Sequence, residues 1–202
     1  CIGAELPSFT IVRKCRGAEY RIAVTNKATG RPAKLVVDGT LLQRSTFDLD
    51  PTGVRPVSYR FDDGTKQSDR DVRLEFDWRA SRVRGTAEDE AVDIATAPGL
   101  QDAASIQALV LARLRHGAES GTIDMIEKDR IKRYHYTLLR RERLKTAIGE
   151  LETVVYRSAR DGSGRETFFW HAPALGYALV QAEQHRDGKR AFQTRIRRYQ
   201  QG

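Results

Sequence analysis

Val72-Arg73-Leu74-Glu75-Phe76-Asp77-Trp78 alternates strictly between apolar and charged side chains. Successive side chains of a β-strand point to opposite faces, so this period of two predicts a strand that buries Val72, Leu74, Phe76 and Trp78 and leaves the charged residues in solvent. An antiparallel sheet with one packed and one solvated face produces such a pattern.

The segments on either side extend this strand into a meander. Residues 56–61 lead into Asp62-Asp63-Gly64, a turn signal that predicts a hairpin with residues 72–78. After the strand, Arg79-Ala80-Ser81 predicts a turn into a further strand at residues 82–86.

The second half of the chain repeats this organisation. Residues 152–157 and 166–170 flank the turn signal at 161–164, and residues 178–185 and 191–197 flank Asp187-Gly188. Weaker strand patterns occur at residues 20–24, 34–37, 45–49, 123–126 and 134–139. Many short strands at regular spacing predict a mainly β protein, built as a single-domain curved antiparallel sheet or open half-barrel.

One segment has a helical period instead. Ala103, Ile106, Val110 and Leu114 recur at spacings of three and four between Asp102 and Gly117, which are good N-cap and C-cap residues. We therefore expect one main helix over about residues 102–116. Its apolar stripe should pack on the concave face of the sheet, against residues such as Leu74, Phe76 and Trp78.

Asp102 and Ser105 share a face of this helix and admit two interpretations. They could act as an acid beside a nucleophile, or Asp102 could accept backbone N–H groups at the helix start. Capping is the simpler interpretation, because it is the usual role of aspartate at that position.

Composition limits the classes of function. The chain has 202 residues and a formal net charge of +8, but its basic residues are interleaved with acidic ones and form a solvated face. We expect no specific nucleic-acid partner and no transmembrane segment, because no apolar run approaches the length of about 18 residues that a span needs. Binding to anionic surfaces through dispersed Arg residues stays an alternative.

The two cysteines, Cys1 and Cys15, lie close to the start of the chain. Scarcity of thiols is typical of exported proteins. The pair could form a disulfide, Cys1 could carry lipid as in a mature lipoprotein, or the thiol could simply be free in a fragment. No signal peptide is present in the chain as given.

No catalytic, cofactor-binding or metal-binding motif is present. The four histidines, His116, His135, His171 and His185, are scattered and lack metal-ligand spacing. His171 follows Trp170 and could serve a hydrolase, as could Ser105, but neither has a visible partner. We expect no cofactor and no metal.

Aromatic side chains give the best functional lead. Trp170, Tyr177, Phe168 and Trp78 could form an apolar pocket on the concave face of a half-barrel, although large aromatics are more often plain core. Trp170 or Tyr177 should then contribute to the pocket wall.

Four segments carry a resemblance to a known family. They are residues 55–60, residues 99–106 with the Asp-x-x-Ser helix start, residues 170–177 with Trp-x-Ala-Pro up to Pro173, and residues 186–189. Over about residues 19–202 the chain resembles the domain of unknown function 3108 family. The resemblance implies a bacterial periplasmic or envelope location and a fold similar to the curved half-barrels of periplasmic lipoprotein carriers. It implies no reaction. Members of the family usually open with a complete hairpin, whereas here we expect residues 1–18 to form an N-terminal arm or a shortened first hairpin.

These observations favour a non-enzymatic envelope module that holds an apolar or amphipathic ligand, such as an envelope lipid, or a partner protein. The alternatives are an envelope hydrolase using Ser105 or His171, and binding to anionic surfaces. Neither the identity of the ligand nor the oligomeric state follows from the sequence.

Overall fold

The structure, a computed structural model, describes residues 4–5, 8–13, 18–25, 40–50, 53–62 and 70–199. Its strands form two seven-stranded sheets, and the helix α1 (Ser105–Arg115) follows the N-terminal sheet in the sequence. The N-terminal sheet is a meander of β2 (Ser8–Arg13), β3 (Ala18–Thr25), β4 (Thr40–Asp50), β5 (Gly53–Asp62), β6 (Val72–Asp77), β7 (Arg82–Ala87) and β8 (Glu90–Ala95).

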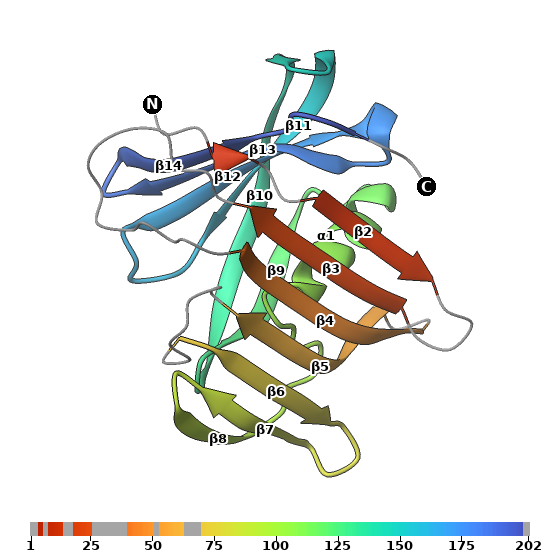
Figure 1. Cartoon of the computed structure of the whole chain (residues 1–202). Coiled ribbons are helices and arrows are strands. Elements are labelled where there is room, and N and C mark those ends of the chain that lie inside the picture. The colour runs from red at the N-terminus through yellow and green to blue at the C-terminus, as the bar shows by residue number, and fades with distance from the viewer. Residues whose placement is uncertain are drawn as a thin grey trace.

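The C-terminal sheet is a second antiparallel meander. It consists of β9 (Ser120–Glu127), β10 (Arg130–Thr146), β11 (Gly149–Ala159), β12 (Arg165–Ala172), β13 (Ala178–Arg186) and β14 (Lys189–Arg195). The short strand β1 (Ala4–Glu5) pairs with β14 in parallel, whereas β2 pairs with β3. The N-terminal arm therefore supplies backbone to both sheets. Figure 1 shows strands of the N-terminal sheet in front of α1 and the long strand β10 running beside the helix.

The mainly β, antiparallel and open architecture with one helix is confirmed, but the strands divide into two sheets where the sequence suggested one. Alternation fixes which face of a strand is buried and does not say which strands share a sheet. The predicted strand at residues 34–37 and part of the turn at 62–64 lie outside the described residues. The sequence pattern predicts neither the short strand β1, nor strand β8, nor the extension of β10 to Thr146 through a dense basic run.

The alternation in residues 72–78 has the predicted structural effect. Leu74 and Phe76 are buried at 1% and 6% exposure, while Arg73, Glu75 and Asp77 are exposed. Trp78 follows the strand, stacks on Phe76, and donates a hydrogen bond from its indole nitrogen to the carbonyl oxygen of Pro56 at 2.5 Å. The predicted strand therefore forms part of the core between the sheets.

The packing of α1 differs from the prediction. Its buried residues are Ser105, Leu109 and Leu114, whereas Ile106 and Val110 are only partly buried. Its nearest partners in the N-terminal sheet are β5 and β4, not β6. The helix has a sheet on each of two sides, so the Leu109 face packs in one direction and Ile106 and Val110 face the other. No helix in the described part of the chain has the length and apolar character that crossing a membrane requires.

The C-terminal sheet is packed on both faces. A large core of residues from both sheets includes Val154 and Tyr156 of β11, and a smaller cluster on the opposite face includes Val155 of the same strand with Trp170 and Val180. Because neighbouring residues of one strand serve different clusters, each substitution in β11 or β12 affects one face only.

Candidate functional site

Gln101 connects the two sheets just before α1 begins. Its backbone N–H donates to Asp124 and its carbonyl accepts from Ile126, both at 2.9 Å, so it extends the C-terminal sheet beside β9. Its side-chain amide nitrogen donates to the carbonyl of Val54 in β5 at 2.8 Å. One buried residue therefore fixes the position of β5 relative to β9.

The next residue, Asp102, connects the start of α1 to strand β4 through hydrogen bonds. One oxygen, Oδ1, accepts the backbone N–H groups of Ala104 and Ser105 at 2.8 Å, and the other, Oδ2, accepts from the hydroxyl of Ser45 in β4 at 2.7 Å. The Ser105 hydroxyl in turn accepts the N–H of Asp102 at 3.0 Å. This is a reciprocal capping arrangement, although α1 itself begins at Ser105. Burial raises the pKa of Asp102 to about 6.

A cavity of about 260 Å³ lies between α1 and the C-terminal sheet. The helix and the turn before it contribute Ala103, Ile106, Gln107 and Val110. The sheet contributes residues of β9 to β13 that face the helix: Ile123, Met125, Glu127, Tyr134, Tyr136, Tyr156, Ser158, Arg165, Thr167, Phe169, His171 and Gln184. The helix residues Ile106 and Val110 are thus only partly buried because they line one side of this cavity.

Along strand β12, the side chains that line the cavity change from charged to aromatic. Arg165, Thr167, Phe169 and His171 are spaced by two residues and all line the cavity, so successive side chains lie about 6.6 Å apart along the strand. Arg165 is exposed and His171 is 3% exposed. The Arg165 end is therefore the mouth and the His171 end is the interior.

Hydrogen bonds hold the aromatic walls in place. The Tyr156 hydroxyl donates to the carbonyl of Ala118 at 2.8 Å, and the Tyr136 hydroxyl accepts from Arg113 of α1 at 3.2 Å. The Arg113 guanidinium also lies over the Tyr136 ring, 5.7 Å from its centroid. Such contacts fix the shape of the cavity before any ligand enters.

His171 is neutral at the interior end. Burial lowers its pKa to about 4, against the opposing effect of the hydrogen bond that Nδ1 donates to the carbonyl of Tyr177 at 2.9 Å. The short helix η1 (Pro173–Leu175) turns the chain so that Tyr177 reaches this position, and Pro173 is its first residue. Within the described part of the chain, Nε2 of His171 has no hydrogen-bond partner and can accept one.

The mouth of the cavity carries an acidic residue that is already paired. Glu127 accepts hydrogen bonds from Lys132 and from the hydroxyl of Tyr134. Burial alone would raise the pKa of Glu127, but these two hydrogen bonds lower it overall. Burial, followed by the hydrogen bond to Glu127, raises the pKa of Tyr134 to about 12.

The four aromatic residues named from the sequence lie elsewhere. Trp170 and Phe168 belong to the smaller cluster, on the face of β12 opposite the cavity, and the Trp170 indole donates to Glu142 at 2.5 Å. Tyr177 and Trp78 pack against the large core and do not line the cavity. The pocket residues on β12 are those at odd positions, so strand alternation explains why Phe169 is in the cavity and Phe168 is not.

The candidate hydrolase residues are not brought together. Ser105 is fully buried, and its hydroxyl hydrogen-bonds to the backbone of Asp102, whereas His171 bonds to Tyr177. No group of acidic, histidine or cysteine side chains suited to a metal occurs among the described residues. Cys1 and Cys15 lie outside the described residues.

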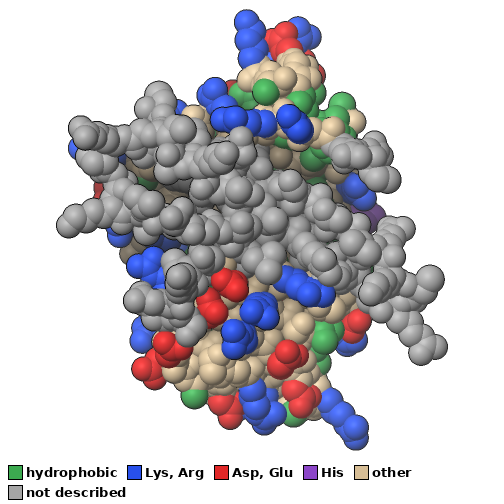
Figure 2. Space-filling view, in the orientation of Figure 1, with side chains coloured by type: hydrophobic (Ala, Val, Ile, Leu, Met, Phe, Trp, Pro, Cys, Tyr) green, Lys and Arg blue, Asp and Glu red, His purple; other side chains and the backbone are tan. Residues whose placement is uncertain are grey.

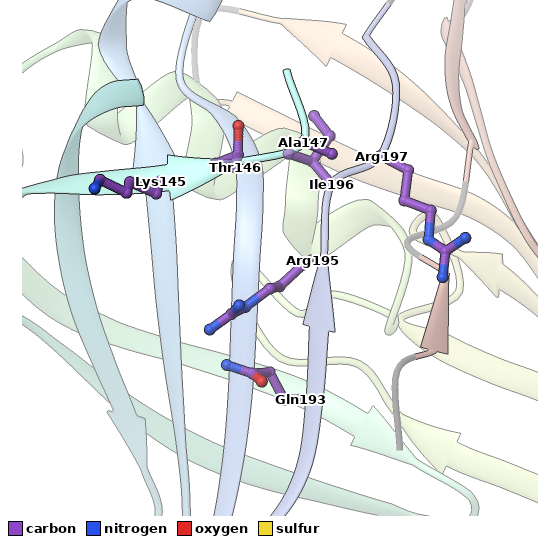
Figure 3. A pocket seen from close by; sticks show the side chains of 7 residues that line it. All are labelled: Lys145, Thr146, Ala147, Gln193, Arg195, Ile196 and Arg197. Carbon is purple, nitrogen blue, oxygen red and sulfur yellow. The ribbon is translucent and has the colours of Figure 1, made fainter. Parts of the chain in front are cut away.

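Two surface features were compared with the cavity as candidate binding sites. A hollow of about 320 Å³ between the end of β10 and β14 contains Lys145, Arg195 and Arg197, but Arg195 and Arg197 point away from one another (Figure 3). Arg195 also donates to Gln181 at 2.8 Å. On the N-terminal sheet, basic and acidic residues are mixed (Figure 2), as in the pairing of Arg82 with Asp93 at 2.7 Å. The hollow thus has basic residues whose charged ends diverge, and the surface of the N-terminal sheet has charges of both signs.

Comparisons with known proteins agree with the fold. The family model described as "Protein of unknown function (DUF3108)" matches residues 6–188. None of the curated proteins is similar enough in sequence to count as a match. A crystallised beta-barrel-like protein of the domain of unknown function DUF1849 from Brucella abortus has 10% sequence identity and a TM-score of 0.50, over 92% of this chain and 85% of that one. At that identity the likeness concerns the fold alone.

Proposed function

This chain belongs to the DUF3108 family, and we propose that it is a non-enzymatic binding module that holds a small amphipathic ligand in the cavity between α1 and the C-terminal sheet. The observation that carries the proposal is the cavity itself, with aromatic walls, a polar mouth and an unpaired acceptor, His171 Nε2, at its interior end. Ligand sites commonly combine an apolar lining with a few placed polar groups.

The size of the cavity indicates a small ligand. Its volume of about 260 Å³ lies just below the usual range of roughly 300–1,000 Å³ for ligand pockets. At about 30 Å³ per water molecule, the cavity has the volume of about nine water molecules. A ligand with about nine non-hydrogen atoms would fill it. An amphiphile with a short chain matches this size, whereas a whole lipid would need part of its chain outside the cavity.

A location in the bacterial periplasm or envelope is part of the same proposal. It is supported by the scarcity of cysteine, with only Cys1 and Cys15 in the whole sequence. The mixed charges of the N-terminal sheet give less support to binding at anionic surfaces, and the separate hydrogen-bond partners of Ser105 and His171 give less support to a hydrolase.

Filling the cavity should weaken ligand binding strongly. Ser158 of β11 lines the cavity between Tyr136 and Thr167, its partners on the two neighbouring strands, so Ser158→Phe should place a ring where the ligand lies. We expect the Ser158→Phe variant to bind 1-octanol at least about tenfold more weakly than the wild type, measured by isothermal titration calorimetry. Far-UV circular dichroism and the unfolding midpoint confirm that the variant is folded.

Ala159→Phe is the matched control. Ala159 is the next residue of β11 and points to the opposite face, so the same ring is added outside the cavity. Its dissociation constant for 1-octanol should equal that of the wild type. Equal binding by all three proteins would place the binding site elsewhere, and no binding by the wild type would refute the proposal.

A further inference from the structure

We propose that the ligand is an anion, a carboxylate on a short apolar chain, and that it binds with its charged end at Arg165 and its chain toward Phe169. This inference rests on the proposed function and adds to it the sign of the charge and the direction of the ligand in the cavity. It follows from which charged groups at the mouth are already paired and which are not.

Arg165 is the unpaired cation of the cavity lining. In the part of the chain that the structure describes, no hydrogen bond or ion pair joins its guanidinium to another residue. Two other arginines of the same sheet are paired on the surface: Arg133 binds Asp124 through two hydrogen bonds, and Arg157 binds Glu166. Arg165 therefore presents free donors at the edge of the cavity.

The acidic residue at the mouth does not neutralise Arg165. Both oxygens of Glu127 are engaged, one with Lys132 and the other with the hydroxyl of Tyr134. A cationic ligand would have to compete with Lys132 for that carboxylate. An anionic ligand meets Arg165 without displacing any contact.

The charges around the mouth favour an anion as well. Arg186 is the cross-strand neighbour of Arg165, and Arg160 is close enough to Tyr134 and Glu127 to influence their pKa values. The acids of the two adjacent turns are Asp161, which lies 3.3 Å from the His135 imidazole, and Asp187. With Lys132 and Glu127 included, basic side chains outnumber acidic ones at this end of the sheet.

The interior end fixes the direction of the ligand. A second charge would be poorly solvated among Tyr156, Phe169 and the neutral imidazole of His171, so the buried end of the ligand must be uncharged. Arg165 and Phe169 are separated by four residues, or about 13 Å of strand. A chain that begins at Arg165 thus extends directly over the aromatic part of the cavity.

A carboxylate is the anion that suits this site best. The planar guanidinium can donate two parallel hydrogen bonds to a carboxylate, which adds direction to the charge attraction. Octanoate, with ten non-hydrogen atoms, is close to the capacity of about nine that follows from a volume of about 260 Å³. We therefore use octanoate as the probe, with 1-octanol and octylammonium as neutral and cationic probes of equal chain length.

The test is a calorimetric titration of these three probes into the wild type, Arg165→Gln and Arg186→Gln. The wild type should bind octanoate about tenfold more tightly than 1-octanol and bind octylammonium most weakly. Arg165→Gln should weaken octanoate by about tenfold and leave 1-octanol unchanged. Arg186→Gln removes the same charge one strand away, outside the cavity lining, and should change octanoate affinity by less than about twofold at 150 mM salt, because screening weakens longer-range attraction.

The outcomes separate the two proposals. Similar binding of all three probes by the wild type, or an unchanged octanoate affinity in Arg165→Gln, would overturn the anionic ligand while leaving the cavity as a binding site. Tightest binding of octylammonium would also overturn it. No binding of any probe would refute the binding function itself. Arg165 and Arg186 are both exposed, so both variants should fold, which their unfolding midpoints would verify.

Discussion

Replacing Asp102 by alanine is expected to lower the free energy of unfolding by about 3 kcal/mol relative to its replacement by asparagine. Alanine leaves the N–H groups of Ala104 and Ser105 and the hydroxyl of Ser45 without their acceptor. Loss of a helix cap costs about 0.5–2 kcal/mol, and a buried unpaired polar group costs about 1–3 kcal/mol. Urea unfolding of the two variants gives the difference directly.

Asparagine is the control because it keeps an acceptor oxygen and removes the charge. Burial raises the pKa of Asp102 to about 6 from its ordinary 3.8, so the folded state favours the protonated carboxyl. The stability that this raised pKa contributes is fully present below about pH 4, where Asp102 is protonated in both states. It is lost as the pH rises through 6, because the buried carboxyl then ionises. Between these values the wild type should lose up to about 3 kcal/mol relative to Asp102→Asn. Equal stability of the alanine and asparagine variants would show that the capping network contributes little.

Replacing Gly85 by alanine is expected to destabilise the protein by about 3–5 kcal/mol or to prevent folding. Gly85 lies in β7 with a φ of +152°, and a Cβ atom there would come within 1.9 Å of the carbonyl oxygen of Arg73 in β6. Strands β6 and β7 are paired with one another, so their backbones cannot move apart here without breaking the sheet. Backbone strain and overpacking each cost about 1–3 kcal/mol.

Gly99→Ala separates the clash from the effect of positive φ. Gly99 has a φ of +73°, and a Cβ atom there would meet nothing within 4 Å. We expect this variant to lose only about 1–2 kcal/mol, the cost of the left-handed conformation for alanine. If both variants lost the same stability in urea unfolding, the close approach of β7 to Arg73 would not be the cause.

The sequence predicts single elements better than their assembly. Alternation in residues 72–78 identifies β6 and its buried face because that signal is local to one strand. The arrangement of the two sheets depends instead on contacts between distant residues, such as that of Gln101 with Val54, 47 positions away in the sequence, and with β9. No local pattern encodes such a pairing.

The residues of the candidate site are also harder to predict from the sequence than single strands are. The sequence indicates an aromatic site, but the residues it points to include Trp170 and Phe168, which face the smaller cluster. The alternating set Arg165, Thr167, Phe169 and His171 contains the needed information, since it combines a charge, a hydroxyl, an aromatic ring and an imidazole on one face. The sequence does not show that this face lines a cavity, because that depends on the position of α1 over the sheet.

Met125 offers the most direct measurement of ligand binding in the cavity. It is the single methionine of the chain and it lines the cavity, so protein labelled with ¹³C at the methionine methyl gives one reporter signal. Addition of octanoate should shift this signal in the wild type until the site is saturated, and the titration should give the dissociation constant found by calorimetry. In Ser158→Phe the same shift should need at least about tenfold more octanoate. A methyl signal that stays fixed in the wild type while calorimetry reports octanoate binding would contradict the account, because the ligand would then occupy another part of the molecule.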